Sequence, residues 1–543
     1  MKHPDQADYV VGVVGCGAMG QGIAQVSAQG GMRTLLFDAR EGGANAAKDA
    51  IAVRINRLVE KGRIGEADAD AAIARLEPVG GIGGLADADC VVEAVFEDLD
   101  VKHSIFKELE GVVRPDCILS SNTSSIPLAS IARVCGQRSR VAGLHFFNPV
   151  PLMKLVEVIR AAETSDETVA NLMALGRRMT RTPVEVKDAP GFLVNMGGRA
   201  YTTEALRIVH DGVATPAQVD AIMRDCWGFR MGPFELMDLT GIDVNYPVSQ
   251  IIYDGYNQDP RLKTSANHKA MFDAGLFGRK TGQGWFSYEN GKPLDRPNAD
   301  FVTDAAPAER VAIVPSEAYL KLMQDSFDGE HEELSELDFA DDLNPEILSK
   351  EIERIKAGCA ELGLTVVPDD GKCPIIASPN GLDATTVATE SQSWTLLGKI
   401  DPARLVCVDL SGDISKRVTV MTAPGADASV RDCVAAAIAA SGRKATVISD
   451  SPGFVGPRMV AMVGNLGCYM AEIGLASPED IDTAMQLGLN YPLGSMAFAQ
   501  AMGPDVCMSI LSGLHEITGD DRYRPTTWLK RRAALGLSLY TPN

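Results

Sequence analysis

One histidine of the sequence stands among residues that could take a proton from a hydroxyl group. His145 lies near the end of an apolar run, and Glu157 follows in the next apolar run along the chain. Imidazole titrates near neutral pH, which suits it to act as a general base. A carboxylate beside such a ring can hold its tautomer and stabilise the imidazolium. The pair therefore indicates acid–base chemistry, although a single histidine can also be structural.

Polar side chains that could contact a reacting oxygen occur in nearby segments. Ser124 belongs to the run Ser121–Ser125, which follows an apolar segment, and Asn195 ends the segment Pro190–Asn195. Hydroxyl and amide groups can donate to or accept from such an oxygen, but serines after a strand also form turns and caps. The eleven cysteines include no C-x-x-C pair. We therefore expect reduced, buried thiols, with no metal and no disulfide framework.

A glycine-rich turn follows the first apolar run of the chain. The run Gly15–Gly20 (G-C-G-A-M-G) opens a predicted helix, as in dinucleotide-binding folds. Its glycines permit a tight turn, a close approach of the backbone to a pyrophosphate, and close packing of helix on strand. Asp38 ends the second predicted strand, where a carboxylate accepts ribose hydroxyl groups and repels a 2′-phosphate. We therefore expect NAD rather than NADP, with nearby Arg40 opposing this preference. The predicted cofactor contacts in this region are Gly15, Gly17, Ala18, Met19, Gly20 and Asp38.

A parallel sheet is required to position these groups. Short β-branched runs alternate with helical stretches over residues 1–188, which predicts an α/β domain with a Rossmann-type sheet and right-handed crossovers. The predicted strands are Tyr9–Gly15, Thr34–Asp38, Cys90–Ala94, Cys117–Ser120 and Val141–His145. Substrates bind beside the dinucleotide at the carboxyl ends of such strands. The prediction places Ser124 and His145 at this edge.

The second half of the chain repeats part of the first. Three segments recur at one offset of 262 residues: Asp188–Phe192 at Asp450–Phe454, Asp220–Met223 at Asp482–Met485, and Gly241–Val244 at Gly503–Val506. Three matches in register indicate a duplicated all-α domain. We expect a Rossmann-type domain (1–188), an all-α domain (189–290), an acidic linker (291–350), a degenerate Rossmann-like segment without a glycine turn (351–449) and a second all-α domain (450–543).

Length and charge narrow the functional classes. The 543 residues carry a formal net charge of −21, and 45% are hydrophobic. This composition suits several globular domains and disfavours nucleic acid, whose phosphates require clustered Lys and Arg. No apolar run is long enough for a membrane span, and the start of the chain shows no secretory pattern. We therefore expect a cytoplasmic protein. The acidic run at 325–342 indicates a solvated spacer.

Together these segments resemble the 3-hydroxyacyl-CoA dehydrogenase family over residues 9–288. The most specific motifs are H-F-F-N-P-V-P at His145–Pro151 and S-N-T-S-S at Ser121–Ser125. The other matching segments are Gly15–Gly20 with Gly22, Val91–Glu97, Lys154–Glu157, Pro190–Asn195, Met231–Leu236 and Gly278–Trp285. One departure is Met196, which stands where the family usually has arginine.

The resemblance implies a role for each matching residue. His145 would remove the proton of the 3-hydroxyl group with Glu157 as its partner, while hydride passes from C3 to NAD. Ser124 and Asn195 would contact the reacting oxygen or hold the acyl group. Three further positions would line the cofactor and one the substrate, namely Glu97, Lys102 and Asn122, and Asn148.

A basic helix face is a candidate for contacting CoA, which is a polyanion. Arg54, Arg57 and Lys61 fall on one side of a predicted helix. They could equally form a solvated face. We keep them as predicted substrate contacts.

The remaining half resembles bacterial members of the family with a duplicated helical domain, which act on 3-hydroxyadipyl-CoA or 3-hydroxybutyryl-CoA in phenylacetate catabolism. At the offset of 262 residues, His145 corresponds to Cys407, Glu157 to Thr419 and Asn195 to Pro457. The second copy therefore lacks the catalytic groups. We expect it to be structural, in an intramolecular pseudo-dimer of the helical domains or in a homo-oligomer.

The sequence thus predicts NAD-dependent oxidation of (S)-3-hydroxyacyl-CoA, with a short-chain or 3-hydroxyadipyl-CoA substrate, in β-oxidation of fatty acids or phenylacetate catabolism. Two alternatives stay open. One is a dehydrogenase for a hydroxy acid that is not joined to CoA, and the other is a non-catalytic structural protein that binds NAD. The intact set of Ser124, His145, Glu157 and Asn195 favours the enzyme.

Overall fold

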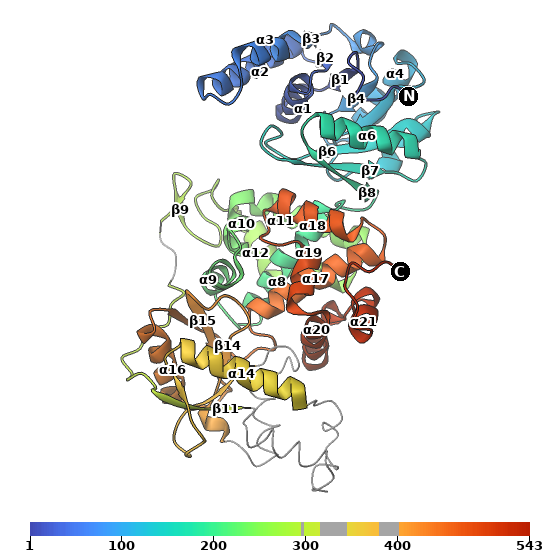
Figure 1. Cartoon of the computed structure of the whole chain (residues 1–543). Helices are drawn as coiled ribbons and strands as arrows, with labels where there is room; N and C mark the ends of the chain where they lie inside the picture. The colour runs from blue at the N-terminus through green and yellow to red at the C-terminus, as the bar shows by residue number, and fades with distance from the viewer. Residues whose placement is uncertain (295–297, 315–344, 379–400) are drawn as a thin grey trace. The chain divides into compact units, whose positions relative to one another are not determined.

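The computed structural model describes residues 1–294, 298–314, 345–378 and 401–543. They form two compact units (Figure 1). The first unit contains Met1–Gly198, Ile251–Asn257 and Gly467–Ala497. The second contains Arg199–Gln250, the described part of Gln258–Leu466, and Phe498–Asn543. The first unit therefore combines the N-terminal sheet with a segment of the second helical copy.

An eight-stranded sheet forms the centre of the first unit. Its order is β3-β2-β1-β4-β5-β6-β7-β8, and all neighbours are parallel except β6 and β7. The strands are β1 (Val10–Val14), β2 (Arg33–Phe37), β3 (Leu76–Pro78), β4 (Cys90–Glu93), β5 (Ile118–Ser121), β6 (Val141–Phe146), β7 (Leu155–Arg160) and β8 (Thr182–Lys187). The central strands are buried along their whole length, as in sheets covered on both faces. The five predicted strands are confirmed, and β3, β7 and β8 were missed.

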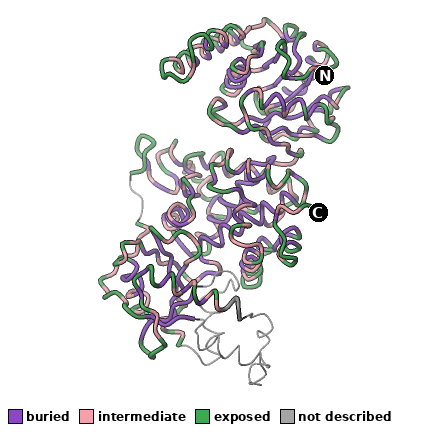
Figure 2. Tube along the Cα trace, viewed as in Figure 1, coloured by how far each residue is buried: buried purple, intermediate pink, exposed green. Residues whose placement is uncertain are grey.

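Helices pack around this sheet and complete its apolar core. They are α1 (Ala18–Gln29), α2 (Gly43–Glu60), α3 (Glu66–Ala74), α4 (Leu99–Val112), α5 (Leu128–Ala132), α6 (Asp166–Arg178) and α7 (Val194–Gly197). One buried cluster joins Val13 of β1, Ile23 of α1 and Leu144 of β6, in the region drawn purple in Figure 2. None of the helices in the described parts of the chain is both long and apolar enough to cross a membrane.

The two helical copies share their element boundaries. The first copy contains α8 (Arg199–His210), α9 (Pro216–Trp227), α10 (Pro233–Thr240), α11 (Ile242–Gly255) and α12 (Ala266–Asp273). The second contains α17 (Gly456–Glu472), α18 (Pro478–Leu489), α19 (Ser495–Met502), α20 (Pro504–Thr518) and α21 (Thr527–Ala534). Asp220 accepts hydrogen bonds from two backbone amides of α10, and Asp482 accepts from two backbone amides of α19. The predicted duplication is therefore confirmed down to its helix caps.

A six-stranded sheet belongs to the second unit. Its order is β12-β11-β13-β14-β15-β16, and only β14 and β15 are antiparallel neighbours. The strands are β11 (Arg310–Val314), β12 (Thr365–Val366), β13 (Ile375–Ala377), β14 (Leu405–Asp409), β15 (Arg417–Met421) and β16 (Lys444–Val447), accompanied by α14 (Pro345–Glu361) and α16 (Ala428–Ala440). One antiparallel pair beside an edge strand repeats the arrangement of β6, β7 and β8. The segment is therefore a reduced form of the first sheet.

The predicted boundary of the acidic linker was wrong. β11 lies within the expected linker at 291–350, yet it pairs with β12 and β13 inside the second sheet. The sequence signal for this strand is a single short apolar run beside a strongly acidic segment, so it was missed. The acidic run at 325–342 lies outside the described residues. The second α/β segment therefore begins at or before Arg310, not at residue 351.

Candidate active site

The antiparallel pairing of β6 with β7 places His145 directly opposite Glu157. His145 Nδ1 lies 2.6 Å from Glu157 Oε2, and both side chains are buried. The other carboxylate oxygen, Oε1, accepts hydrogen bonds from the backbone amides of Val194 at 2.8 Å and Leu193 at 3.1 Å. The carboxylate is thus held from two sides. It directs hydrogen to Nδ1 of the ring and leaves Nε2, on the opposite side, as the proton acceptor.

The chain reaches these two amides through a turn with positive φ angles. Gly191 has φ of 76°, and Phe192 has φ of 48°, a region that side chains other than glycine rarely adopt. The Phe192 ring lies 5.8 Å from the His145 ring and covers it with apolar surface. The same backbone occurs at Gly453 and Phe454, with φ of 68° and 52°. The turn therefore belongs to the fold of both copies, and only the first copy places a carboxylate against it.

The predicted serine-rich loop is organised by Glu97. Its carboxylate accepts hydrogen bonds from Thr123 Oγ1 at 2.6 Å and from the amides of Ser124 and Ser125, each at 2.9 Å. Burial opposes ionisation of Glu97, but the hydrogen bond from Thr123 and the charge of Lys102 outweigh it and lower the pKa of Glu97 to about 2. Glu97 therefore fixes the loop that carries Ser124 beyond the end of β5.

Lys102 lies behind this loop. Only 1% of its side chain is exposed, and its ammonium lies 2.8 Å from Glu93 and 3.4 Å from Glu97. A buried ammonium needs such partners because an unpaired charge away from water is costly. The structure therefore indicates a supporting role for Lys102 in place of the predicted direct contact with the cofactor. Sequence analysis did not single out Glu93, although a carboxylate inside an apolar strand was a signal; it also accepts from Ser121 Oγ at 2.6 Å.

The other predicted residues lie at or beside the carboxyl edge of the sheet. Asn122 follows β5, and its Oδ1 accepts a hydrogen bond from the amide of Phe146 at 2.8 Å, which ties the ends of β5 and β6 together. Ser124 and Asn148 are exposed, and Asn195 is half-buried in α7. Because β5 and β6 are parallel neighbours, the residues after them share one edge with the histidine.

The glycine turn has the space that a dinucleotide requires. A Cβ on Gly15 would lie 2.7 Å from the carbonyl oxygen of Ala94, and a Cβ on Gly20 would lie 1.8 Å from that of Gly15. A Cβ on Gly17 would meet no atom of the described structure within 4 Å, so the backbone there faces open space. Helix α1 begins directly after Gly17 without a side-chain cap, which leaves its first amides to bind phosphate. The turn therefore fits a pyrophosphate.

Asp38 stands at the end of β2, beside this turn. Its carboxylate accepts hydrogen bonds from the amide of Cys16 at 2.8 Å and from Arg40 Nε at 2.9 Å. The hydrogen bond from the Arg40 side chain lowers the pKa of Asp38 to about 2. The carboxylate is therefore ionised at neutral pH, as binding of ribose hydroxyl groups and repulsion of a 2′-phosphate require.

The basic face predicted to contact CoA is divided in the structure. Arg54 donates hydrogen bonds to Gln21 and Gln25 of α1 at 3.1 Å and 3.2 Å, so it joins α2 to α1. Arg57 and Lys61 are exposed. Of the three, only Arg57 and Lys61 have side chains fully open to an anionic ligand.

The second copy has no corresponding pair. The register of β15 on β16 repeats that of β7 on β8 at the offset of 262 residues, so Thr419 occupies the position of Glu157 as predicted. On the neighbouring strand, however, Thr419 faces Asp409 and not Cys407. The predicted correspondence of His145 with Cys407 was therefore wrong by two residues, because the segment that joins the paired positions is shorter in the second copy.

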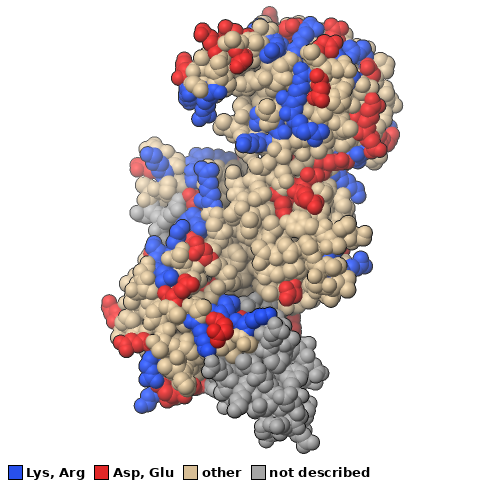
Figure 3. Space-filling model, viewed as in Figure 1, with Lys and Arg blue, Asp and Glu red and all other residues tan. Residues whose placement is uncertain are grey.

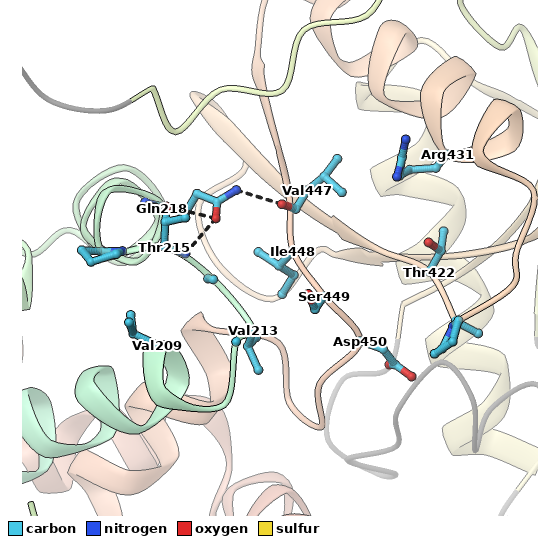
Figure 4. Close-up of a pocket in the computed structure, with 15 residues that line it drawn as sticks. Val209, Val213, Thr215, Gln218, Thr422, Arg431, Val447, Ile448, Ser449 and Asp450 are labelled. Atoms are coloured by element: carbon cyan, nitrogen blue, oxygen red, sulfur yellow. Dashed lines mark hydrogen bonds between the residues drawn. The ribbon is translucent and has the colours of Figure 1, made fainter. Parts of the chain in front are cut away.

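A cavity of about 670 Å³ lies in the second unit (Figure 4). The loop between α8 and α9 forms one side, and Gln218 Nε2 donates a hydrogen bond to the carbonyl oxygen of Val447 in β16 at 2.9 Å. Arg431 and Asp450 are its charged side chains, and none of the predicted catalytic or cofactor residues lines it. We therefore assign the chemistry to the first unit.

A place for a dinucleotide and a proton acceptor at the same edge of one sheet are the two requirements of alcohol oxidation, so the first unit has the architecture of a dinucleotide-dependent dehydrogenase. The family model described as "3-hydroxyacyl-CoA dehydrogenase, NAD binding domain" matches residues 10–189. The model for the C-terminal domain matches twice, at 191–288 and 453–538. The chain belongs to the 3-hydroxyacyl-CoA dehydrogenase family, and its cofactor is NAD.

Relatives cover the chain at two lengths. The 3-hydroxyadipyl-CoA dehydrogenase of Escherichia coli K12 is 34% identical over 97% of both chains. The crystal structure of 3-hydroxybutyryl-CoA dehydrogenase from the same organism has a TM-score of 0.79 and 31% identity, over 97% of this chain and 98% of that one. The (S)-3-hydroxybutyryl-CoA dehydrogenase of Ralstonia eutropha has a TM-score of 0.50 and 36% identity, and it covers 52% of this chain and 99% of its own. The duplicated form therefore has a full-length counterpart.

Proposed function

We propose that the chain oxidises (S)-3-hydroxyacyl-CoA to 3-oxoacyl-CoA with His145 as the general base. The contact of His145 Nδ1 with Glu157 Oε2 at 2.6 Å carries this proposal, because it turns Nε2 into the proton acceptor. Nε2 takes the proton of the 3-hydroxyl group, and NAD, when bound, accepts the hydride from C3. The carboxylate of Glu157 stabilises the imidazolium that forms. In the reverse direction the ring returns the proton to the oxygen.

Ser124 and Asn195 are proposed to hold the substrate oxygen and the acyl group. Glu97 binds the backbone of Ser124, which fixes the loop beside the end of β5. Asn195 follows Val194, whose amide binds Glu157. Both side chains are therefore attached to the same framework as the His145 pair.

The proposed substrates are short-chain 3-hydroxyacyl-CoA esters, including 3-hydroxyadipyl-CoA. The names of the full-length and half-length relatives support this range. The net charge of −21 does not exclude CoA, since Arg57 and Lys61 are exposed and Figure 3 shows Lys and Arg side chains gathered over part of the first unit on the face that it draws. Comparing kcat/KM for 3-hydroxybutyryl-CoA, 3-hydroxyadipyl-CoA and longer esters tests the range.

The test of the reaction is the loss of NADH absorbance in the presence of acetoacetyl-CoA. Turnover is the expected result. Activity on a free hydroxy acid but on no CoA thioester would show a different dehydrogenase. Binding of NADH without turnover of any of these compounds would favour a non-catalytic NAD-binding protein.

Replacing Asp38 by serine is expected to shift cofactor use toward NADP. The variant loses a charged acceptor for the ribose hydroxyl groups, so KM for NAD rises roughly ten- to hundredfold. Arg40, which now pairs with Asp38 at 2.9 Å, becomes available to a 2′-phosphate. Steady-state kinetics with both cofactors measure the ratio of the two kcat/KM values. Adding Arg40→Gln should remove the gain for NADP; an unchanged ratio in Asp38→Ser would show that this carboxylate does not select the cofactor.

We further propose that the two halves form an intramolecular pseudo-dimer. The amide of Lys187 donates to the carbonyl oxygen of Leu475 at 2.8 Å, and the amide of Ser449 donates to that of Val213 at 2.9 Å. Both donors and both acceptors are related by the offset of 262 residues. Each sheet therefore binds the segment before α9 or α18 of the opposite copy, as two subunits could do in a symmetric dimer of a single-copy chain.

A chain that ends at Pro293 is expected to dimerise or to lose most of its activity. Truncation removes α18, whose Met485 packs on Gly197 beside the catalytic pair. The exposed apolar surface then needs a second copy of the shortened chain as its cover. Light scattering after size-exclusion chromatography gives the mass of the species, and the acetoacetyl-CoA assay gives its activity. A soluble monomer with full activity would contradict the proposal.

A further inference from the structure

Helix α18 of the second copy lies against the segment that holds Glu157. A Cβ on Gly488 would lie 2.9 Å from Cγ2 of Val194 and 3.1 Å from Cδ2 of Leu155. One turn away, a Cβ on Gly197 would lie 2.5 Å from Sδ of Met485. The contact is therefore close enough that its geometry depends on glycine at position 488.

Both residues that Gly488 contacts are directly connected to the catalytic carboxylate. The amide of Val194 donates the shorter backbone hydrogen bond to Glu157 Oε1, at 2.8 Å. Leu155 precedes Glu157 by two residues on β7, so both side chains lie on the same face of the strand. A shift of α18 against this segment would move the amide, the carboxylate or both. Through Glu157 Oε2 it would also move the ring of His145.

The duplication provides an internal comparison. At the offset of 262 residues, Gly488 corresponds to Cys226 of α9, and Leu155 corresponds to Arg417 of β15. Cys226 Sγ lies 3.4 Å from the carbonyl oxygen of Arg417, so a larger side chain fills the equivalent contact. There the strand carries Thr419 where β7 carries Glu157. Of the two equivalent contacts, only the one next to the catalytic carboxylate has glycine.

We propose that Gly488 is a positioning residue of the active site, so that the copy without catalytic groups completes the copy that has them. The backbone of α18 approaches Val194 closely and holds its amide against Glu157 Oε1. This inference rests on the proposed roles of His145 and Glu157. It assigns the second copy a function in catalysis in addition to its structural one.

Gly488→Val in the full-length chain is expected to lower kcat roughly 10- to 100-fold, because a displacement of about 1 Å in a catalytic arrangement can have an effect of this size. KM for NAD and the Kd for NADH should not change, since the glycine turn lies on β1. Gly488→Ala should lower kcat less, in the same direction. A merely structural role predicts the opposite for Gly488→Ala, because alanine favours a helix over glycine.

Two further variants decide the origin of the effect. Adding Val194→Ala to Gly488→Val removes both Cγ atoms at the contact and should restore kcat. Cys226→Val adds bulk at the equivalent position of the first copy and should leave kcat unchanged. Wild-type kcat in Gly488→Val, an equal loss in Cys226→Val, or a loss that Val194→Ala does not restore would each overturn the proposal. If Gly488→Val does not fold, wild-type kcat in Gly488→Ala overturns it. Retained activity in His145→Ala would instead contradict the proposed function.

Discussion

Replacing His145 by alanine is expected to lower kcat by roughly 10²–10⁴-fold, the range of a lost general base. The side chain is buried opposite Glu157 on β6, and no ring would then take the 3-hydroxyl proton as the hydride leaves C3. Binding of NADH should stay unchanged because the glycine turn lies between β1 and α1. Steady-state reduction of acetoacetyl-CoA and fluorescence titration with NADH measure the two quantities.

The matched control for this variant is His515→Ala. His515 is an exposed histidine of α20 whose ring lies 3.2 Å from Asp521, and its loss should not affect turnover. Thermal unfolding of both variants shows whether the fold is kept. Near wild-type turnover in His145→Ala, with the fold intact, would remove this histidine from the mechanism.

Glu157→Gln is expected to lower kcat by roughly 10²–10⁴-fold through the wrong tautomer of His145. The amides of Leu193 and Val194 point at one side-chain oxygen of Glu157, so they would orient the new amide with its oxygen toward them. Its NH₂ group would then face His145 Nδ1. The ring would have to accept at Nδ1 and carry hydrogen on Nε2, where it could not take the substrate proton.

Thr419→Val is the control for the glutamine variant, because Thr419 is the equivalent residue of the second copy. It should leave kcat unchanged. Measured as kcat and as KM for each substrate, Glu157→Gln should reduce kcat with little change in KM for NAD. An unchanged kcat in Glu157→Gln would show that the carboxylate only packs beside the ring.

Features contained in one short segment could be predicted from the sequence. The run Gly15–Gly20 forms its turn because glycine is needed where a Cβ would meet Ala94 or Gly15, and Asp38 ends the next strand. The cap residues Asp220 and Asp482 recur because each binds the start of a helix about a dozen residues further along the chain. Such features depend on local backbone geometry, which residue type and spacing largely determine.

The sequence by itself determined the Rossmann-type sheet, the nucleotide turn, the duplicated helical domain and the residue types of the site. Only the tertiary structure decided which of these residues meet. A strand pattern does not state its register, so the pairing of His145 with Glu157, and of Thr419 with Asp409 in place of Cys407, depends on the loop between the strands. The burial of Lys102 and the contact of Gly488 with Val194 likewise require segments remote in the sequence to pack together. Packing of this kind follows from the shape and apolar surface of whole elements, which no local pattern contains.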